Sequence, residues 1–210
     1  ILERKLLNQS EVILPTSLAT NLSFVGRKSE INHLCTLVEQ ENKVIVIQGE
    51  GGIGKTTLAQ QYFREQEFEL VLELLMAKET QNITSVESVI EEWLKKDLQE
   101  EPGREFGITL RRLKRHLETR RIGILIDNLE PALDAQGMLI PAHRRYVELL
   151  RVLSSQVQSV TLITSRDRIC EPALNLYHYR LIGLDLSAWE KYYRASSVSC
   201  DFPTLHAMHK

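Results

Sequence analysis

A glycine-rich segment at residues 49–56, GEGGIGKT, constrains this 210-residue chain more than any other part of the sequence. It matches the pattern G-x-x-x-x-G-K-S/T and stands between an apolar β-branched run at residues 43–48 and a helical pattern at residues 55–65. Glycines let such a loop turn sharply, so that successive N–H groups point into one concavity at the positive end of the helix. We therefore predict a nucleoside triphosphate site, with Lys55 on the β- and γ-phosphates and Thr56 on Mg²⁺.

Apolar strand patterns alternate with helical patterns along the rest of the chain. Strands are predicted at residues 43–48, 68–76, 122–126 and 160–164, with a short fifth strand at residues 179–182. Helices are predicted around residues 31–38 and at residues 55–65, 85–98, 109–119 and 144–153. Most of the strands are apolar throughout, which is typical of parallel strands covered on both faces. The predicted fold class is therefore α/β, a three-layer P-loop NTPase with a parallel sheet of about five strands.

An aspartate directly follows the third predicted strand. Residues 122–126, IGILI, lead into Asp127, whose carboxylate is expected at the edge of the sheet where open α/β folds bind ligands. Magnesium needs such a carboxylate in addition to the loop threonine, so Asp127 is the second predicted metal ligand. The alternative is an aspartate that caps a helix after a core strand.

The residue after Asp127 is Asn128, at the position where many P-loop ATPases carry a glutamate that activates water. An amide cannot accept a proton as a base. Glu130 is the remaining candidate for that role, and the alternative for Glu130 is an ordinary surface acid. The sequence thus supports nucleotide binding more firmly than it supports hydrolysis.

A polar turn with an arginine follows the fourth predicted strand. Residues 160–166 read VTLITSR, so that Arg166 stands at the carboxyl end of this strand. A guanidinium group there can fork onto a terminal phosphate and report whether that phosphate is present. The alternative is a solvated arginine without a ligand.

Four segments, in this order, resemble the NB-ARC ATPases of the STAND group of signalling NTPases. They are FVGR at residues 24–27, the loop at residues 49–56, ILIDN at residues 124–128 and LITSR at residues 162–166. Bacterial members, particularly cyanobacterial ones, are the most similar, and the resemblance covers roughly residues 24–190. It implies that Val25 and Arg27 lie beside the adenine and the ribose. The residues expected to hold the phosphates and Mg²⁺ are Gly49, Gly51, Gly52, Ile53, Gly54, Lys55, Thr56 and Thr57.

The resemblance also implies roles for the residues beyond the loop. Asp127 would support the metal and Arg166 would act as the first sensor, which completes a predicted catalytic set of Lys55, Asp127, Glu130 and Arg166. The implied strand order is 2-3-1-4-5. Family members typically rest with ADP, exchange it for ATP when a ligand releases autoinhibition, and then oligomerise. The family's GLPL motif and winged-helix histidine are not found here, so we expect the switch to be incomplete in this chain.

The chain divides by its composition into three predicted parts. Residues 1–23 are predicted to be a linker, residues 24–184 the nucleotide-binding domain, and residues 185–210 the start of an incomplete helical subdomain. No apolar run approaches the ~18 residues of a membrane span, and no signal peptide is visible. Three widely spaced cysteines fit a reducing compartment, so we expect a cytoplasmic protein.

These features favour an ATP/ADP-binding regulatory module for signal transduction, a switch with slow Mg²⁺-dependent ATP hydrolysis. The alternative is a nucleotide-locked, non-hydrolysing scaffold that mediates protein–protein assembly, and Asn128 favours it somewhat. A metabolic kinase or a GTPase ranks third, because the guanine motif N-K-x-D does not follow the loop. Expected partners are the nucleotide and other protein chains or further copies of this one. Nucleic acid is not expected, because the basic residues at 111–121 are explained as the solvated side of an amphipathic helix.

Overall fold

The computed structural model of the protein describes residues 26–76, 82–184 and 188, and Arg27–Leu184 form one compact unit within it. Val25 lies outside the described residues, as do the predicted linker at residues 1–23 and, apart from residue 188, the predicted helical subdomain at residues 185–210. The boundaries of the predicted nucleotide-binding domain therefore stay a prediction.

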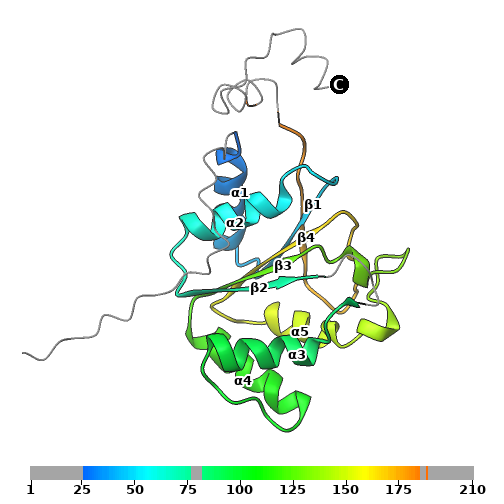
Figure 1. Ribbon diagram of the computed structural model, residues 1–210. Helices are drawn as coiled ribbons and strands as arrows, with labels where there is room; N and C mark the ends of the chain where they lie inside the picture. The colour runs from blue at the N-terminus through cyan, green and yellow to red at the C-terminus, as the bar shows by residue number, and fades with distance from the viewer. Residues whose placement is uncertain (1–25, 77–81, 185–187, 189–210) are drawn as a thin grey trace, which may run out of the picture. The chain divides into compact units, whose positions relative to one another are not determined.

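Five parallel strands make the central sheet of this unit (Figure 1). They are β1 (Val44–Gln48), β2 (Leu70–Leu75), β3 (Ile122–Asp127), β4 (Val160–Ser165) and β5 (Tyr177–Arg180). One face is covered by α1 (Lys28–Glu39) and α2 (Lys55–Glu65), and the other by α3 (Val86–Glu92), α4 (Phe106–Thr119) and α5 (Tyr146–Leu153). The predicted three-layer α/β class with a five-stranded parallel sheet is confirmed.

The strands lie in the order β2-β3-β4-β1-β5. Strand β4 therefore lies between β3 and β1, whereas the expected order 2-3-1-4-5 placed β1 beside β3. All six positions of β4 are buried, which suits a strand with neighbours on both edges. Strands β2 and β5 carry exposed positions and form the two edges of the sheet.

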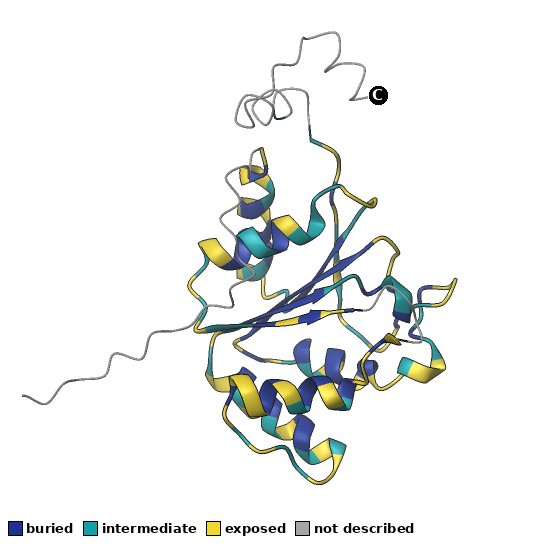
Figure 2. Ribbon diagram, viewed as in Figure 1, coloured by how far each residue is buried: buried dark blue, intermediate teal, exposed yellow. Residues whose placement is uncertain are grey.

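Helices cover both faces of the sheet, and the side chains of one strand alternate between these faces. Val44 and Val46 belong to a large apolar cluster with residues of α3, α4 and α5. Ile45 and Ile47 point to the opposite face, which α1 and α2 cover, and all four side chains are at most 1% exposed. This two-sided burial, dark blue in Figure 2, is the reason why most positions of the inner strands are apolar.

The helices begin and end close to the predicted limits, with two differences. The helix predicted at residues 85–98 is α3 followed by a π-helical turn, Trp93–Asp97, and Ser85 caps it by accepting a hydrogen bond from the N–H of Ser88 at 3.2 Å. Helix α4 begins at Phe106, ahead of its predicted start. None of the helices that the structure describes has both the length and the apolar character needed to cross a membrane.

Helix α4 turns an apolar side to the core and a basic side to solvent. Leu113 and Leu117 are fully buried, while Arg115 and His116 each lie 2.6 Å from the carboxylate of Glu100. Acidic partners therefore surround much of the basic side, which fits a solvated helix face.

Candidate phosphate-binding site

The loop at residues 49–56 joins the carboxyl end of β1 to the first turn of α2. Gly52 and Gly54 have left-handed φ angles of 77° and 97°, which other residues rarely adopt. Gly49 is required for a different reason, since a Cβ atom there would lie 2.9 Å from the carbonyl oxygen of Leu181, just after β5. The predicted glycines therefore serve both the conformation of the loop and the close approach of its neighbour.

Lys55 is the first residue of α2, and its side chain folds back over the loop. Its Nζ atom donates to two loop carbonyl oxygens at 2.8 and 2.9 Å. Burial is the largest influence on the pKa of Lys55 and lowers it. Arg166 acts in the same direction, whereas Glu130 and Asp127 act to raise this pKa. The ammonium group thus lies among the charges of the site, where phosphate oxygens can replace the loop carbonyls as its acceptors.

Asp127 ends β3 and accepts two hydroxyl groups on one oxygen. The Oγ1 atoms of Thr56 and Thr164 donate to Asp127 Oδ1 at 2.6 and 2.5 Å. The structure therefore brings together the predicted pair of Thr56, from α2, and Asp127. Thr164, from β4, is a site residue that was not predicted individually. Its sequence signals were its place in LITSR and at the polar end of the strand.

Thr56 and Asp127 have the donor chemistry of a magnesium site. A hydroxyl and a carboxylate oxygen 2.6 Å apart can both turn to one cation, and Mg²⁺ takes oxygen ligands in proteins. Mg²⁺ also keeps waters and substrate phosphates among its ligands, so that one or two protein oxygens suffice. The residues present therefore fit the predicted metal.

Glu130 opens a short 3₁₀ helix, Glu130–Ala132, and its carboxylate faces Arg166. Arg166 Nε lies 3.2 Å from Glu130 Oε1, and the backbone N–H of Arg166 donates to Oε2 at 3.4 Å. Asn128 has a left-handed φ of 68°, and in the amide orientation that satisfies both groups its side-chain nitrogen lies 2.7 Å from Glu130 Oε1. Glu130 is thus held by two residues of the site, and it is not a free surface acid.

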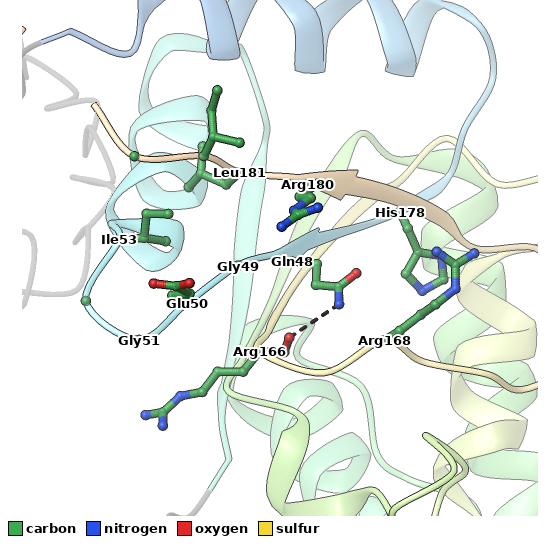
Figure 3. A pocket seen from close by; sticks show the side chains of 13 residues that line it. Gln48, Gly49, Glu50, Gly51, Ile53, Arg166, Arg168, His178, Arg180 and Leu181 are labelled. Atoms are coloured by element: carbon green, nitrogen blue, oxygen red, sulfur yellow. Dashed lines mark hydrogen bonds between the residues drawn. The ribbon is translucent and has the colours of Figure 1, made fainter. Parts of the chain in front are cut away.

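These side chains line a pocket of about 720 Å³ at the carboxyl edge of the sheet. The predicted site residues in its wall are Gly51, Gly52, Lys55, Thr56, Asp127, Glu130 and Arg166. A second hollow of about 1010 Å³ extends from the loop towards β5, past Ile53 and Ile182 (Figure 3). Arg166 lines both hollows, so it stands where they adjoin.

Arg27 is 5% exposed, and protein atoms surround its guanidinium group. It donates to the carbonyl oxygens of Ile182 at 2.8 Å and Ile53 at 3.2 Å, and it pairs with Glu30 at 2.7 Å. Arg27 thus ties α1, the loop and the segment after β5 together. Thr57, in contrast, is exposed on α2. The expected place of Arg27 beside adenine and ribose stays a prediction.

The combination of this loop with a parallel sheet, and with a loop threonine bonded to the aspartate at the end of β3, defines a P-loop NTPase domain. The family model of the NB-ARC domain matches residues 27–171. The chain belongs to this family.

The solved structures that are similar to this chain in fold include an ORC chain and a Cdc6 protein. The structure of Drosophila ORC bound to DNA contains a chain with 16% identity and a TM-score of 0.54, over 80% of this chain and 46% of that one. Cdc6p from Pyrobaculum aerophilum has 13% identity and a TM-score of 0.57, over 90% of this chain and 54% of that one. At these identities the likeness shows the fold alone. This chain spans about half the length of each of the two chains that it matches. A comparison with curated protein sequences finds no match.

Proposed function

We propose that this chain is an ATP- and ADP-binding regulatory module of a STAND-type signalling protein, which switches between the two nucleotide states and hydrolyses ATP slowly. One observation carries the proposal. Asp127 accepts hydrogen bonds from Thr56 and Thr164, and this joins the phosphate loop, the metal carboxylate and the strand of Arg166 in one site. Membership of the NB-ARC family supports an adenine nucleotide. Our proposal places Val25 and Arg27 beside the base and the ribose.

The phosphates bind to the loop at the positive end of α2. Lys55 moves from the loop carbonyls to the β- and γ-phosphates, and the hydroxyl of Thr57 adds a further contact. Thr56 and Asp127 hold Mg²⁺, which when bound neutralises part of the charge on these phosphates.

Hydrolysis requires a base and a group that stabilises the transferring phosphoryl group. The oxygen of a water molecule bonds to the γ-phosphorus while the bond from this phosphorus to the β,γ-bridging oxygen breaks, and the electron pair of the broken bond stays on ADP. The carboxylate of Glu130 takes the proton of the water. Lys55 and Arg166 stabilise the charge on the transferring group. Asn128 holds Glu130 and takes no proton.

A nucleotide-locked scaffold is the second candidate function. It is favoured by the amide of Asn128 directly after Asp127 and by the engagement of Glu130 with Arg166. In this case ADP is structural, no turnover occurs, and protein–protein assembly is the function.

We also propose the domain boundaries, the partners and the cellular location of the module. Residues 24–184 form the nucleotide-binding domain, which the compact unit Arg27–Leu184 supports, and residues 185–210 begin a helical subdomain. The partners are other protein chains or further copies of this one, in the cytoplasm. The ion pairs on the basic side of α4 support a role without nucleic acid.

The first experiment is to denature the purified protein and identify the released nucleotide by chromatography. Released ADP or ATP supports the proposal, and released GDP contradicts it. Calorimetry then compares ATP binding to Lys55→Ala and to a control, Lys95→Ala, at an exposed lysine of the π-helical turn. Loss of Lys55 should weaken binding at least ~10-fold, because a charge-assisted hydrogen bond contributes about 1.5–3 kcal/mol. Wild-type affinity in Lys55→Ala would refute the site. Slow turnover that Glu130→Gln abolishes favours the switch, and retained ADP without turnover favours the scaffold.

A further inference from the structure

Arg166 and Glu130 form an ion pair beside the phosphate loop, and we propose that this pair is a latch that the γ-phosphate opens. Arg166 binds Glu130 when the site holds ADP or no nucleotide, and it leaves Glu130 for the γ-phosphate when the site holds ATP. Glu130 is then free to take the proton of the attacking water. The inference rests on the proposed binding of ATP and ADP at this site.

Arg166 engages both carboxylate oxygens of Glu130. Its Nε lies 3.2 Å from Oε1, and its backbone N–H donates to Oε2 at 3.4 Å. The side chain of Glu130 is 15% exposed, whereas that of Arg166 is 65% exposed. The carboxylate is therefore largely enclosed, while most of the Arg166 side chain lies in solvent and can rotate.

The guanidinium group of Arg166 also lies against the phosphate loop. A Cβ atom on Gly51 would lie 3.3 Å from the guanidinium carbon and 3.4 Å from a terminal nitrogen. A glycine at position 51 thus lets the guanidinium group pack on the backbone that binds the phosphates. A terminal phosphate in the loop is within reach of Arg166 after a rotation of its side chain.

Two other arginines that line the hollow next to this pocket, Arg168 and Arg180, lie elsewhere. In Figure 3, Arg168 lies beside His178 and Arg180 lies over Gln48, whereas Arg166 extends away from both, on the side of Gly51. Of the three, only Arg166 also lines the pocket that contains the predicted metal ligands. It is therefore the arginine that can exchange between the carboxylate and a phosphate.

Asn128 is the second residue that holds the carboxylate of Glu130. When Arg166 moves to the γ-phosphate, the carboxylate of Glu130 loses its cationic partner and keeps the hydrogen bond from Asn128. The amide of Asn128 can hold Glu130 while Glu130 acts as the base, because an amide donates a hydrogen bond to the carboxylate without neutralising its charge.

A double-mutant cycle tests the latch. Calorimetry gives the Kd of Mg·ADP and of a Mg·ATP analogue with a β,γ-imido bridge for the wild type, Glu130→Gln, Arg166→Gln and the double variant. In the wild type, the latch must open before Arg166 can bind the γ-phosphate, and this lowers the affinity for the analogue. Glu130→Gln removes that cost only where Arg166 is present. It should therefore tighten binding of the analogue about threefold to fivefold more in the Arg166 background than in the Arg166→Gln background. No such difference is expected for ADP, because the latch stays closed. Should Arg166→Gln not fold, Arg166→Lys, which keeps the charge but loses the Nε contact, replaces it.

Glu50→Gln is the matched control, since it removes a negative charge from the phosphate loop, at a residue outside the latch. It should change the affinity for the analogue equally with and without Arg166. Equal effects of Glu130→Gln in both backgrounds would overturn the latch and leave the proposed function standing. A wild-type protein that binds neither nucleotide would overturn the proposed function and the latch with it.

Discussion

Replacing Thr164 by valine tests whether a hydroxyl of β4 holds the site together. Thr164 is 1% exposed, and its Oγ1 donates to Asp127 Oδ1 at 2.5 Å and accepts the backbone N–H of Asn128 at 2.9 Å. Valine has nearly the same shape but no hydroxyl, so that both hydrogen bonds are lost in one substitution.

The expected cost follows from these two bonds. A hydrogen bond to a charged group contributes about 1.5–3 kcal/mol, and a buried N–H without an acceptor costs about 1–3 kcal/mol. Asp127 keeps its hydrogen bond from Thr56 and lines the pocket, where water reaches it, which places the sum in the lower part of the range. We therefore expect Thr164→Val to lower the free energy of unfolding by about 2.5–4 kcal/mol.

Thr161→Val on the same strand is the matched control. Thr161 is 0% exposed, and among the described residues its Oγ1 has no hydrogen-bond partner. Removing such a hydroxyl should raise the free energy of unfolding by about 1 kcal/mol. Urea unfolding of the nucleotide-free proteins, followed by circular dichroism, measures both changes without the stabilisation that a bound ligand adds. Changes of the same sign and size in the two variants would refute the reasoning from hydrogen bonds.

Two further comparisons test the loop and its support. Gly49→Ala should lower the free energy of unfolding by about 1–3 kcal/mol, because its Cβ atom would meet the backbone of Leu181. Gly107→Ala in α4 has no atom within 4 Å of its Cβ and should raise the free energy of unfolding by up to ~1 kcal/mol. The urea midpoints of the two variants check this contrast. Burial acts to raise the pKa of Glu30, but hydrogen bonds from Ser29 and Arg27 outweigh it and lower the pKa below its ordinary value of 4.5. A carboxyl group with a lowered pKa stabilises the fold at pH values above 4.5, and this stabilisation is lost as the pH falls through the folded-state pKa. Glu30→Gln should therefore lower the free energy of unfolding at neutral pH and make it decline less steeply in acid. Urea unfolding of the wild type and Glu30→Gln between pH 3 and pH 7 measures this. Parallel curves of unfolding free energy against pH for the two proteins would contradict it.

The layers of the fold could be predicted from the strands alone, but their order could not. Strands buried on both faces are mostly apolar, and this pattern is local in the sequence. Residues 122–126 and 160–164 both have the pattern of a buried strand, and this pattern does not indicate which of them lies beside β1. The choice depends on contacts between distant residues, such as the pairing of Val44 with Thr161.

The site residues divide in the same way. Lys55 follows from a local motif, and Asp127 and Arg166 follow from the rule that the carboxyl ends of parallel strands meet at one edge. The pair of Glu130 and Arg166 could not be predicted, because it depends on the left-handed turn at Asn128 and on the direction of a long side chain. The sequence indicates which residues gather at the edge, while the turns decide which of them touch.

The position of β4 between β3 and β1 allows Arg166 to contact both the phosphate loop and Glu130. Neighbouring strands lie about 4.8 Å apart, so the carboxyl end of β4 is one strand spacing from the end of β1 and one from the end of β3. In the order 2-3-1-4-5, β1 would separate β4 from β3, and Thr164 would stand about two spacings, ~9.6 Å, from Asp127, beyond the reach of a hydrogen bond. The hydrogen bond at Asp127 and the proposed latch therefore both depend on the insertion of β4 between two strands that precede it in the chain.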